Sequence, residues 1–374
     1  MSQLFEPIAL RELALANRIV VSPMCQYSAI DGRAQSWHTV HLGQLALASA
    51  GMLMLEATAV EARGRITPGC LGLWNDDTEA ALATLLGTLR DLNPAVRVPI
   101  ALQLAHAGRK GSSHVPWQGG RQIPIDAGGW RTLAPSAVTH ADGEEAPQEI
   151  GPVTREELVR RFVGTAERAA RLGVDALELH AAHGYLLHQF LSPVANRRDD
   201  DYGGSLENRM RFPLEVLDAV RAAWPSTRPL GVRISASDWD DESSWAIDEA
   251  CTFARRCEAL GADWIDVSSG GVSTRQRIAL GPGYQVPFAE RVKAAVDIPV
   301  VAVGLITEPA QAEAIVAEGR ADLVALARAF LYDPRWVWHA AAELGATVGA
   351  PPQYWRSEPR EARGLYGETR VGQR

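Results

Sequence analysis

The sequence is poor in cysteine. Its four cysteines, at positions 25, 70, 251 and 257 of 374 residues, are too few for a disulfide scaffold. No Cys-x-x-Cys pair occurs, so the sequence predicts neither a zinc knuckle nor an iron–sulfur cluster, and we expect no metal site.

Positive charge and long apolar runs are also lacking. Lys and Arg number 37 against 45 Asp and Glu, and the formal net charge of −8 argues against a nucleic-acid or anionic-membrane partner. No apolar run approaches the length of a membrane span, and the first residues lack the pattern of a secretory signal. We therefore expect a cytoplasmic protein with small-molecule partners.

The chain does contain a regular alternation of short apolar runs with amphipathic stretches. The expected strands are Arg18–Ser22, Met52–Glu56, Pro99–Leu104, Ala176–His180, Leu230–Ser235, Trp264–Ser268, Val300–Val303 and Leu323–Ala327. The expected helices are Trp37–Ala50, Thr78–Leu92, Arg155–Leu172, Leu206–Trp224, Asp248–Leu260 and Pro309–Glu318. Such alternation implies parallel strands. Eight units, with no GxGxxG after the first strand, favour a single (β/α)8 TIM barrel over an open doubly wound sheet.

Two segments interrupt this pattern. Residues 107–152 follow the third expected strand and are rich in Gly, Pro and Trp, which is typical of a lid or binding loop. Residues 351–374 form an irregular tail that contains Tyr354, Trp355 and Arg356. We therefore predict one barrel domain over residues 1–350, with a long loop insertion after strand three, followed by this tail.

The densest group of polar residues at an expected strand end is His180, His183 and Tyr185. Catalytic residues of β/α barrels lie at such ends. Three interpretations are open. The histidines are caps, they form a metal site, or they are a pair of N–H donors for a substrate oxygen. The metal site lacks a third ligand of recognisable pattern. The donor pair explains all three residues, because Tyr185 adds a weak acid that can deliver a proton.

Two arginines indicate an anionic ligand. Arg233 lies inside an apolar strand, where its charge needs either an internal carboxylate or a bound anion, and both interpretations stay open. Arg328 follows the eighth strand, where barrels commonly bind phosphate. One anion at the centre and one phosphate at the rim fit a cofactor such as FMN. Cys25 ends the first strand, either as a small buried hydrophobic residue or as a cofactor contact.

Seven segments of the chain together form a recognisable pattern. They are Asn17–Ile19, Pro23–Tyr27, Glu56–Val60, Gly64–Thr67, Gln103–Lys110, His180–Leu186 and Asp201–Arg209. In this order they resemble the old yellow enzyme family of FMN-dependent ene-reductases, and most closely its bacterial branch of the xenobiotic reductase A type. The resemblance extends from Leu4 to about Trp355.

The resemblance implies a role for each matched cofactor residue. The flavin ring would contact Ser22, Pro23, Met24, Cys25, Ala57 and Gln103. The phosphate would be held by Arg328 and by the backbone around Val303, Gly304 and Ala327. Arg233 would balance the charge of the reduced flavin, which would make an internal carboxylate unnecessary.

The resemblance also implies a reaction. NAD(P)H would reduce FMN, which would then pass hydride to an activated alkene such as an α,β-unsaturated aldehyde or ketone, a maleimide or a nitro compound. His180 and His183 would bind the substrate oxygen with help from Tyr27, and Tyr185 would donate the proton. In this branch a C-terminal residue reaches the neighbouring subunit's active site. Trp355 or Arg356 would do so here, in a homodimer or homotetramer, unless the segment is an ordinary tail.

Two departures from the family pattern matter. Ala327 adds a methyl group where the family has glycine, at the expected phosphate site. Leu305 and Ile306 follow strand seven, where xenobiotic reductase A has a tryptophan, and this predicts a roomier substrate pocket. A flavin-free barrel acting as a binding or scaffold protein is the alternative from another class. It leaves Arg233, Arg328 and the His-His-Tyr group unexplained.

Overall fold

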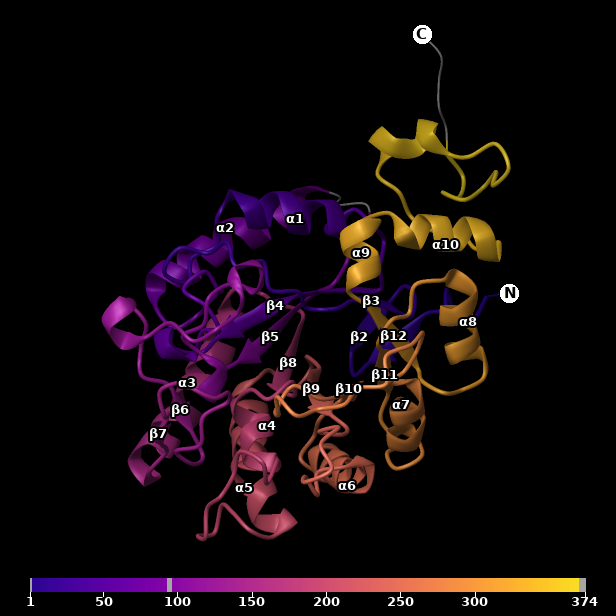
Figure 1. Ribbon diagram of the computed structural model, residues 1–374. Helices are drawn as coiled ribbons and strands as arrows, with labels where there is room; N and C mark the ends of the chain where they lie inside the picture. The colour runs from indigo at the N-terminus through magenta and orange to yellow at the C-terminus, as the bar shows by residue number, and fades with distance from the viewer. Residues whose placement is uncertain (1, 93–95, 370–374) are drawn as a thin grey trace.

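A closed barrel of parallel strands forms the centre of the computed structural model, which describes residues 2–92 and 96–369 (Figure 1). In barrel order the strands are β3 (Ile19–Val21), β4 (Met52–Ala59), β5 (Ile100–Ala105), β8 (Ala176–Ala181), β9 (Leu230–Ser235), β10 (Trp264–Ser268), β11 (Val300–Val303) and β12 (Leu323–Leu326). Pairing of β12 with β3 closes the ring. The predicted (β/α)8 barrel and its eight strands are confirmed. β4 runs past Glu56 because a β-bulge between Leu55 and Thr58 lets it continue.

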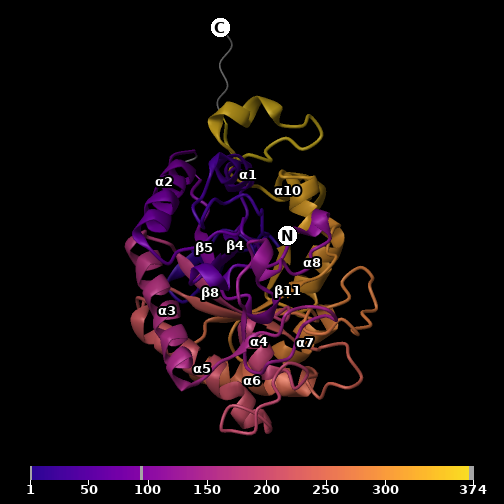
Figure 2. The same cartoon turned by 60° about the vertical axis from the view of Figure 1, so that its left-hand side comes forward.

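Helices surround the barrel (Figure 2). They include α1 (Ser36–Ala46), α2 (Asp76–Leu92), α3 (Pro152–Arg171), α5 (Leu206–Ala223), α6 (Ile247–Ala259) and α8 (Pro309–Ala317), which correspond to the six predicted helices. α1 ends before Ala50, and Ser49 adopts a φ of 63°, which a right-handed helix does not accept. Four helices were not predicted, because each is too short to show a clear period: α4 (Leu186–Leu191), α7 (Val286–Lys293), α9 (Arg328–Tyr332) and α10 (Trp336–Leu344).

The interior of the barrel is packed with apolar side chains. This cluster comprises Val20, Met52, Met54, Ala101, Ala176, Trp264, Val301, Val303, Leu323 and Ala325, together with Leu10 and Leu15. The last two belong to an unpredicted hairpin of β1 (Ile8–Leu10) and β2 (Leu13–Leu15). The hairpin therefore seals the N-terminal end of the barrel and leaves the C-terminal end for a site.

The predicted insertion, residues 107–152, is tied to the barrel mouth. It contains short 3-10 turns and the small strands β6 (Leu133–Ala134) and β7 (Gln148–Glu149). The buried Arg109 donates hydrogen bonds to the carbonyls of Val138 and Thr139 within the insertion and to Val272 beyond β10. The insertion therefore lies as a fixed cover beside the strand ends.

The C-terminal tail packs on α10. The Trp338 ring makes edge contacts with Tyr354 and Tyr366, and Val348 N–H donates to Leu365 O over 2.8 Å. Residues 370–374 of the predicted tail lie outside the described residues. None of the helices in residues 2–92 and 96–369 is both long and apolar enough to cross a membrane.

Candidate active site

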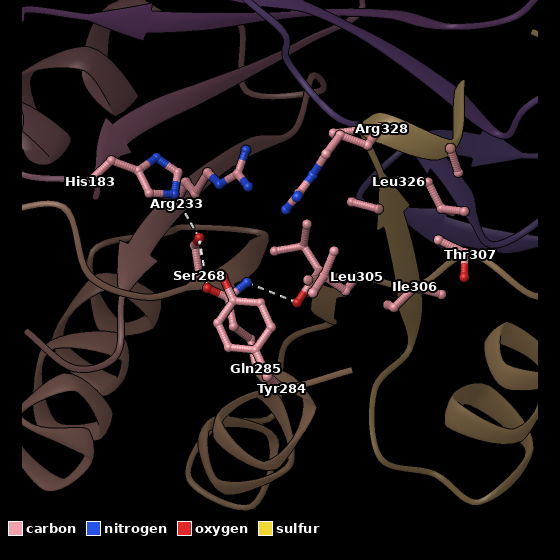
Figure 3. Close-up of a pocket in the computed structure, with 15 residues that line it drawn as sticks. His183, Arg233, Ser268, Tyr284, Gln285, Leu305, Ile306, Thr307, Leu326 and Arg328 are labelled. Atoms are coloured by element: carbon pink, nitrogen blue, oxygen red, sulfur yellow. Dashed lines mark hydrogen bonds between the residues drawn. The ribbon is translucent and has the colours of Figure 1, made fainter. Parts of the chain in front are cut away.

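A cavity of about 190 Å³ opens at the C-terminal ends of β9 to β12 (Figure 3). Six of the predicted site residues line it: His183, Arg233, Val303, Gly304, Ala327 and Arg328. In Figure 3 the guanidinium groups of Arg233 on β9 and Arg328 at the start of α9 point into this space. The cavity therefore offers two cations to one ligand.

Arg233 has an internal carboxylate partner. Its Nε lies 3.5 Å from Asp266 Oδ2, because β9 and β10 pair Arg233 with Asp266 inside the barrel. The expectation that no internal carboxylate would be needed is therefore wrong. The contact is longer than a charge-assisted hydrogen bond, and Nε has no hydrogen-bond acceptor among the described residues. Arg233 thus keeps the capacity to bind an anion in the cavity.

His180, His183 and Tyr185 come together as predicted. His183 Nδ1 lies 3.3 Å from His180 Nε2, and the Tyr185 ring meets the His180 ring edge-on at 4.9 Å. Burial, and next the charge of Arg233, lower the pKa of both histidines well below the usual value, so both are neutral at pH 7. Burial also raises the pKa of Tyr185, which keeps its proton.

The protonated nitrogen of His180 follows from its backbone contact. The N–H of Ala182 donates to His180 Nδ1 over 3.3 Å, so Nδ1 is an acceptor. The single proton of a neutral ring then sits on Nε2, which faces His183. His180 therefore directs its N–H toward His183 Nδ1, 3.3 Å away.

The part of the cavity predicted to bind phosphate includes Gly304 and Ala327. Gly304 has a φ of 122°, and a Cβ there would lie 2.7 Å from Gln285 Nε2, so this position needs glycine. Gln285 Nε2 donates to Val303 O over 2.9 Å. Ala327 has a φ of −112°, which any residue adopts, so its methyl group brings no left-handed strain.

The remaining predicted flavin contacts lie on the other side of the barrel mouth. Ser22 accepts a hydrogen bond of 3.2 Å from Arg233 Nη1. Ala57 falls within the bulge of β4, and Gln103 is buried on β5. The cavity of Figure 3 is not lined by Pro23, Met24, Cys25, Ala57 or Gln103. The neighbouring Cys70 thiol, followed by burial, raises the pKa of Cys25, so Cys25 is a neutral thiol.

Three predicted substrate residues lie away from this cavity. Tyr27 contacts Trp117 of the insertion, with ring centroids 5.6 Å apart. Trp355 donates its Nε1–H to Ala350 O, and neither Trp355 nor Arg356 lines the cavity of its own barrel. Figures 1 and 2 place their segment beside α10.

Sequence reasoning missed a polar chain that joins the histidines to the phosphate end. His183 Nε2 lies 2.6 Å from Ser268 Oγ, which lies 3.3 Å from Gln285 Oε1 (Figure 3). Ser268 ends a predicted strand and could have been found by its position. Gln285 precedes the unpredicted α7, and no motif or strand-end position in the sequence marks it as a site residue.

Lys110 was also missed as a site residue. Its Nζ donates to the carbonyls of His183 and Gly271, each over 2.8 Å. His183 has a φ of 58°, which is strained for a residue with a side chain. Lys110 therefore holds this backbone in place. Burial lowers its pKa to about 8.

These observations fit FMN. Arg328 and the close backbone approach at Gly304 suit a phosphate, and the guanidinium group of Arg233, which lines the cavity, suits an anionic ring. A barrel with such a rim beside a neutral histidine pair is that of a flavin-dependent oxidoreductase.

Comparison with known proteins identifies the family. The model of the NADH:flavin oxidoreductase / NADH oxidase family matches residues 3–346, and the chain belongs to this family, that of old yellow enzyme. The chain is 43% identical over 357 residues to the NADPH dehydrogenase of Geobacillus sp. (strain WCH70), covering 95% of this chain and 98% of the relative. It is 40% identical over 356 residues to the NADPH dehydrogenase of Bacillus subtilis (strain 168), covering 95% and 98%.

Solved structures agree. Morphinone reductase superimposes with a TM-score of 0.76 at 26% identity, covering 99% of this chain and 94% of that chain. A second morphinone reductase structure, in complex with tetrahydroNAD, has a TM-score of 0.74 at 27% identity, with coverage of 97% and 94%. The protein is thus an FMN-dependent oxidoreductase that uses NAD(P)H, and the alternative of a flavin-free scaffold is removed.

Proposed function

We propose that this protein reduces the carbon–carbon double bond of activated alkenes, namely α,β-unsaturated aldehydes and ketones, maleimides and nitro compounds. FMN, when bound, supplies the hydride after reduction by NAD(P)H. The observation that carries the proposal is the meeting of two neutral histidines with a protonated tyrosine beside the Arg233 cavity.

His180 and His183 bind the substrate oxygen. The N–H on His180 Nε2 faces His183 Nδ1 over 3.3 Å, and a substrate oxygen bound between the two rings would compete for it. Negative charge grows on that oxygen as the double bond is reduced, and fixed donors stabilise it in a buried site. Neutral imidazoles do this without giving up a proton. Tyr27 assists from the neighbouring loop.

Tyr185 donates the proton to the α-carbon. Its ring lies against His180, and Lys110 Nζ lies 5.1 Å from the ring centroid. Burial holds the pKa of its hydroxyl well above the usual value, so the proton is present throughout the neutral range.

The cofactor would be held by residues on both sides of the barrel mouth. Ser22, Pro23, Met24, Cys25, Ala57 and Gln103 would hold the ring, and Arg233 would balance the charge of the reduced flavin. Arg328 and the backbone of Val303, Gly304 and Ala327 would hold the phosphate. The inward-pointing guanidinium groups in Figure 3 support this assignment.

The tail, residues 351–374, completes the substrate site of a neighbouring subunit in a homodimer or homotetramer. Support comes from Trp355 and Arg356, which lie in a segment packed on α10 and do not line their own cavity.

An anaerobic two-step experiment tests the reaction. The FMN-loaded protein is reduced with one equivalent of NADPH and then mixed with 2-cyclohexenone. The proposal expects reoxidation of the flavin and one equivalent of cyclohexanone. Reduction by NADPH without any reoxidation by the enone would contradict it.

A further inference from the structure

Beside the predicted flavin contacts lies a buried carboxyl group that the proposed mechanism does not use. Glu178 of β8 is fully buried and accepts two hydrogen bonds, one at each oxygen. Gln103 Nε2 of β5 donates to Oε1 over 2.7 Å, and Trp264 Nε1 of β10 donates to Oε2 over 3.1 Å. A side chain of this kind inside a barrel needs an explanation, because burying it is costly.

The contact between Glu178 and Trp264 depends on the absence of a side chain at one position of β9. β9 separates β8 from β10, and its Gly231 is the register partner of both Glu178 and Trp264. A Cβ at Gly231 would lie 1.9 Å from the indole ring. Glycine therefore lets the indole cross β9 and reach the carboxyl group.

The hydrogen-bond chain has a fixed direction. An indole N–H only donates, whereas a carboxyl group accepts at both oxygens and an amide accepts at one end and donates at the other. With Trp264 donating on one side and Gln103 Nε2 on the other, Gln103 Oε1 is turned away from Glu178. The arrangement holds while the Glu178 oxygen opposite Gln103 carries no proton, since a proton there would donate to the amide oxygen of Gln103 and reverse the amide.

We propose that Glu178 is a positioning residue that fixes the amide of Gln103, so that Gln103 offers an acceptor oxygen to the ring N–H of the flavin. This inference rests on the proposed contact between Gln103 and FMN. The pyrimidine part of a flavin carries one N–H between two carbonyl groups, so the end of the amide that faces it decides whether the contact is attractive. Glu178, which accepts at the oxygen facing Gln103, sets that choice.

The test is FMN binding by the apoprotein, followed by flavin fluorescence. In Glu178→Gln only one oxygen remains, and Trp264 and Gln103 compete for it. When Trp264 takes it, the new amide N–H₂ faces Gln103, which must turn its own oxygen inward. We expect the Kd for FMN to rise about tenfold, while the proton-donating chemistry at Tyr185 stays intact.

A second substitution separates positioning from general damage. In a Trp264→Phe background the competing donor is gone, so the amide oxygen of Glu178→Gln can face Gln103 and restore its orientation. Adding Glu178→Gln to Trp264→Phe should then change the Kd less than about twofold. A tenfold loss in both backgrounds, or in neither, would overturn the inference.

A third background guards against poor folding of the tryptophan variant. In Gln103→Met no amide remains to orient, and Glu178→Gln should cost no further FMN affinity. A further tenfold loss there would assign Glu178 a merely structural role. Wild-type apoprotein that binds no FMN at all would instead refute the proposed function, so the two failures are distinguishable.

Discussion

Five histidines near the strand ends fall into two groups. His38, His106 and His188 each lie beside a carboxylate, with distances of 3.3 Å to Glu56, 3.0 Å to Glu61 and 2.9 Å to Asp238. His180 and His183 have no carboxylate partner in the part of the chain that the structure describes, and they lie near Arg233 and Lys110 instead.

The difference shows how histidines serve either as structural links or as groups that bind substrate. A carboxylate holds an imidazole in place through a fixed contact to one ring nitrogen, which suits a structural link. Cations and burial favour the neutral form, and a neutral ring next to a cavity can bind a growing negative charge without protonating it. The four predictions below, all hypotheses, test this division.

The largest effect should follow from removing the donor pair. Replacing both His180 and His183 with Ala should slow alkene reduction by on the order of 10³-fold, because the substrate oxygen loses its donors. The measurement is the rate of flavin reoxidation by 2-cyclohexenone. His106→Gln is the matched control. A comparable loss of rate in that variant would show that the histidines paired with carboxylates and the His180–His183 pair do not differ in their role.

Tyr185→Phe should have the next largest effect. Without the proton donor, the alkene half-reaction should slow by about 10²-fold, while reduction of the flavin by NADPH stays nearly constant. Stopped-flow absorbance measures each half separately. Equal slowing of both halves would remove Tyr185 as the proton donor.

His106 should matter for stability in acid. Burial opposes ionisation of Glu61, but the hydrogen bond from His106 lowers its pKa to about 2. A folded-state pKa below the ordinary value of 4.5 contributes stability above pH 4.5, and that contribution is lost as pH falls toward 2. His106→Gln should reduce the unfolding free energy at pH 6 by on the order of 1–2 kcal/mol, and the unfolding free energy should then fall less steeply between pH 4.5 and 2. Denaturant titrations at several pH values measure this, and the same steepness in wild type and variant would show that His106 does not shift the pKa of Glu61.

The smallest effect concerns pH and the catalytic pair. Since the pKa of each ring is held well below 6.5, neither histidine should titrate between pH 6 and 8. The rate of the alkene half-reaction should therefore show no histidine step in this range. A step near pH 6.5 that disappears in His183→Ala would show that the pair carries charge.

Much of the fold follows from periodicity. Fully apolar runs such as Val300–Val303 predict buried parallel strands with correct ends. The β1–β2 hairpin, with strands of three residues each, and α7, with eight residues, were not predicted. Strand-end position also brought His180, His183 and Tyr185 together correctly.

The partners of charged groups were harder to foresee. Nothing in the sequence pairs Asp266 with Arg233, since that contact depends on the register of β9 against β10. The same applies to Glu178, whose link to Trp264 requires the absence of a side chain at Gly231. Which histidines face carboxylates and which face cations is likewise set by packing of distant segments.

The most direct test of the central claim is the visible absorption spectrum of the purified protein, recorded without oxygen before and after addition of a phenol. A phenolate mimics the negatively charged oxygen that the histidine pair is proposed to bind above a flavin. The account predicts a flavin spectrum that gains a broad long-wavelength charge-transfer band, and a variant with both His180→Ala and His183→Ala that lacks the band. A colourless protein that stays colourless after incubation with FMN would contradict the account.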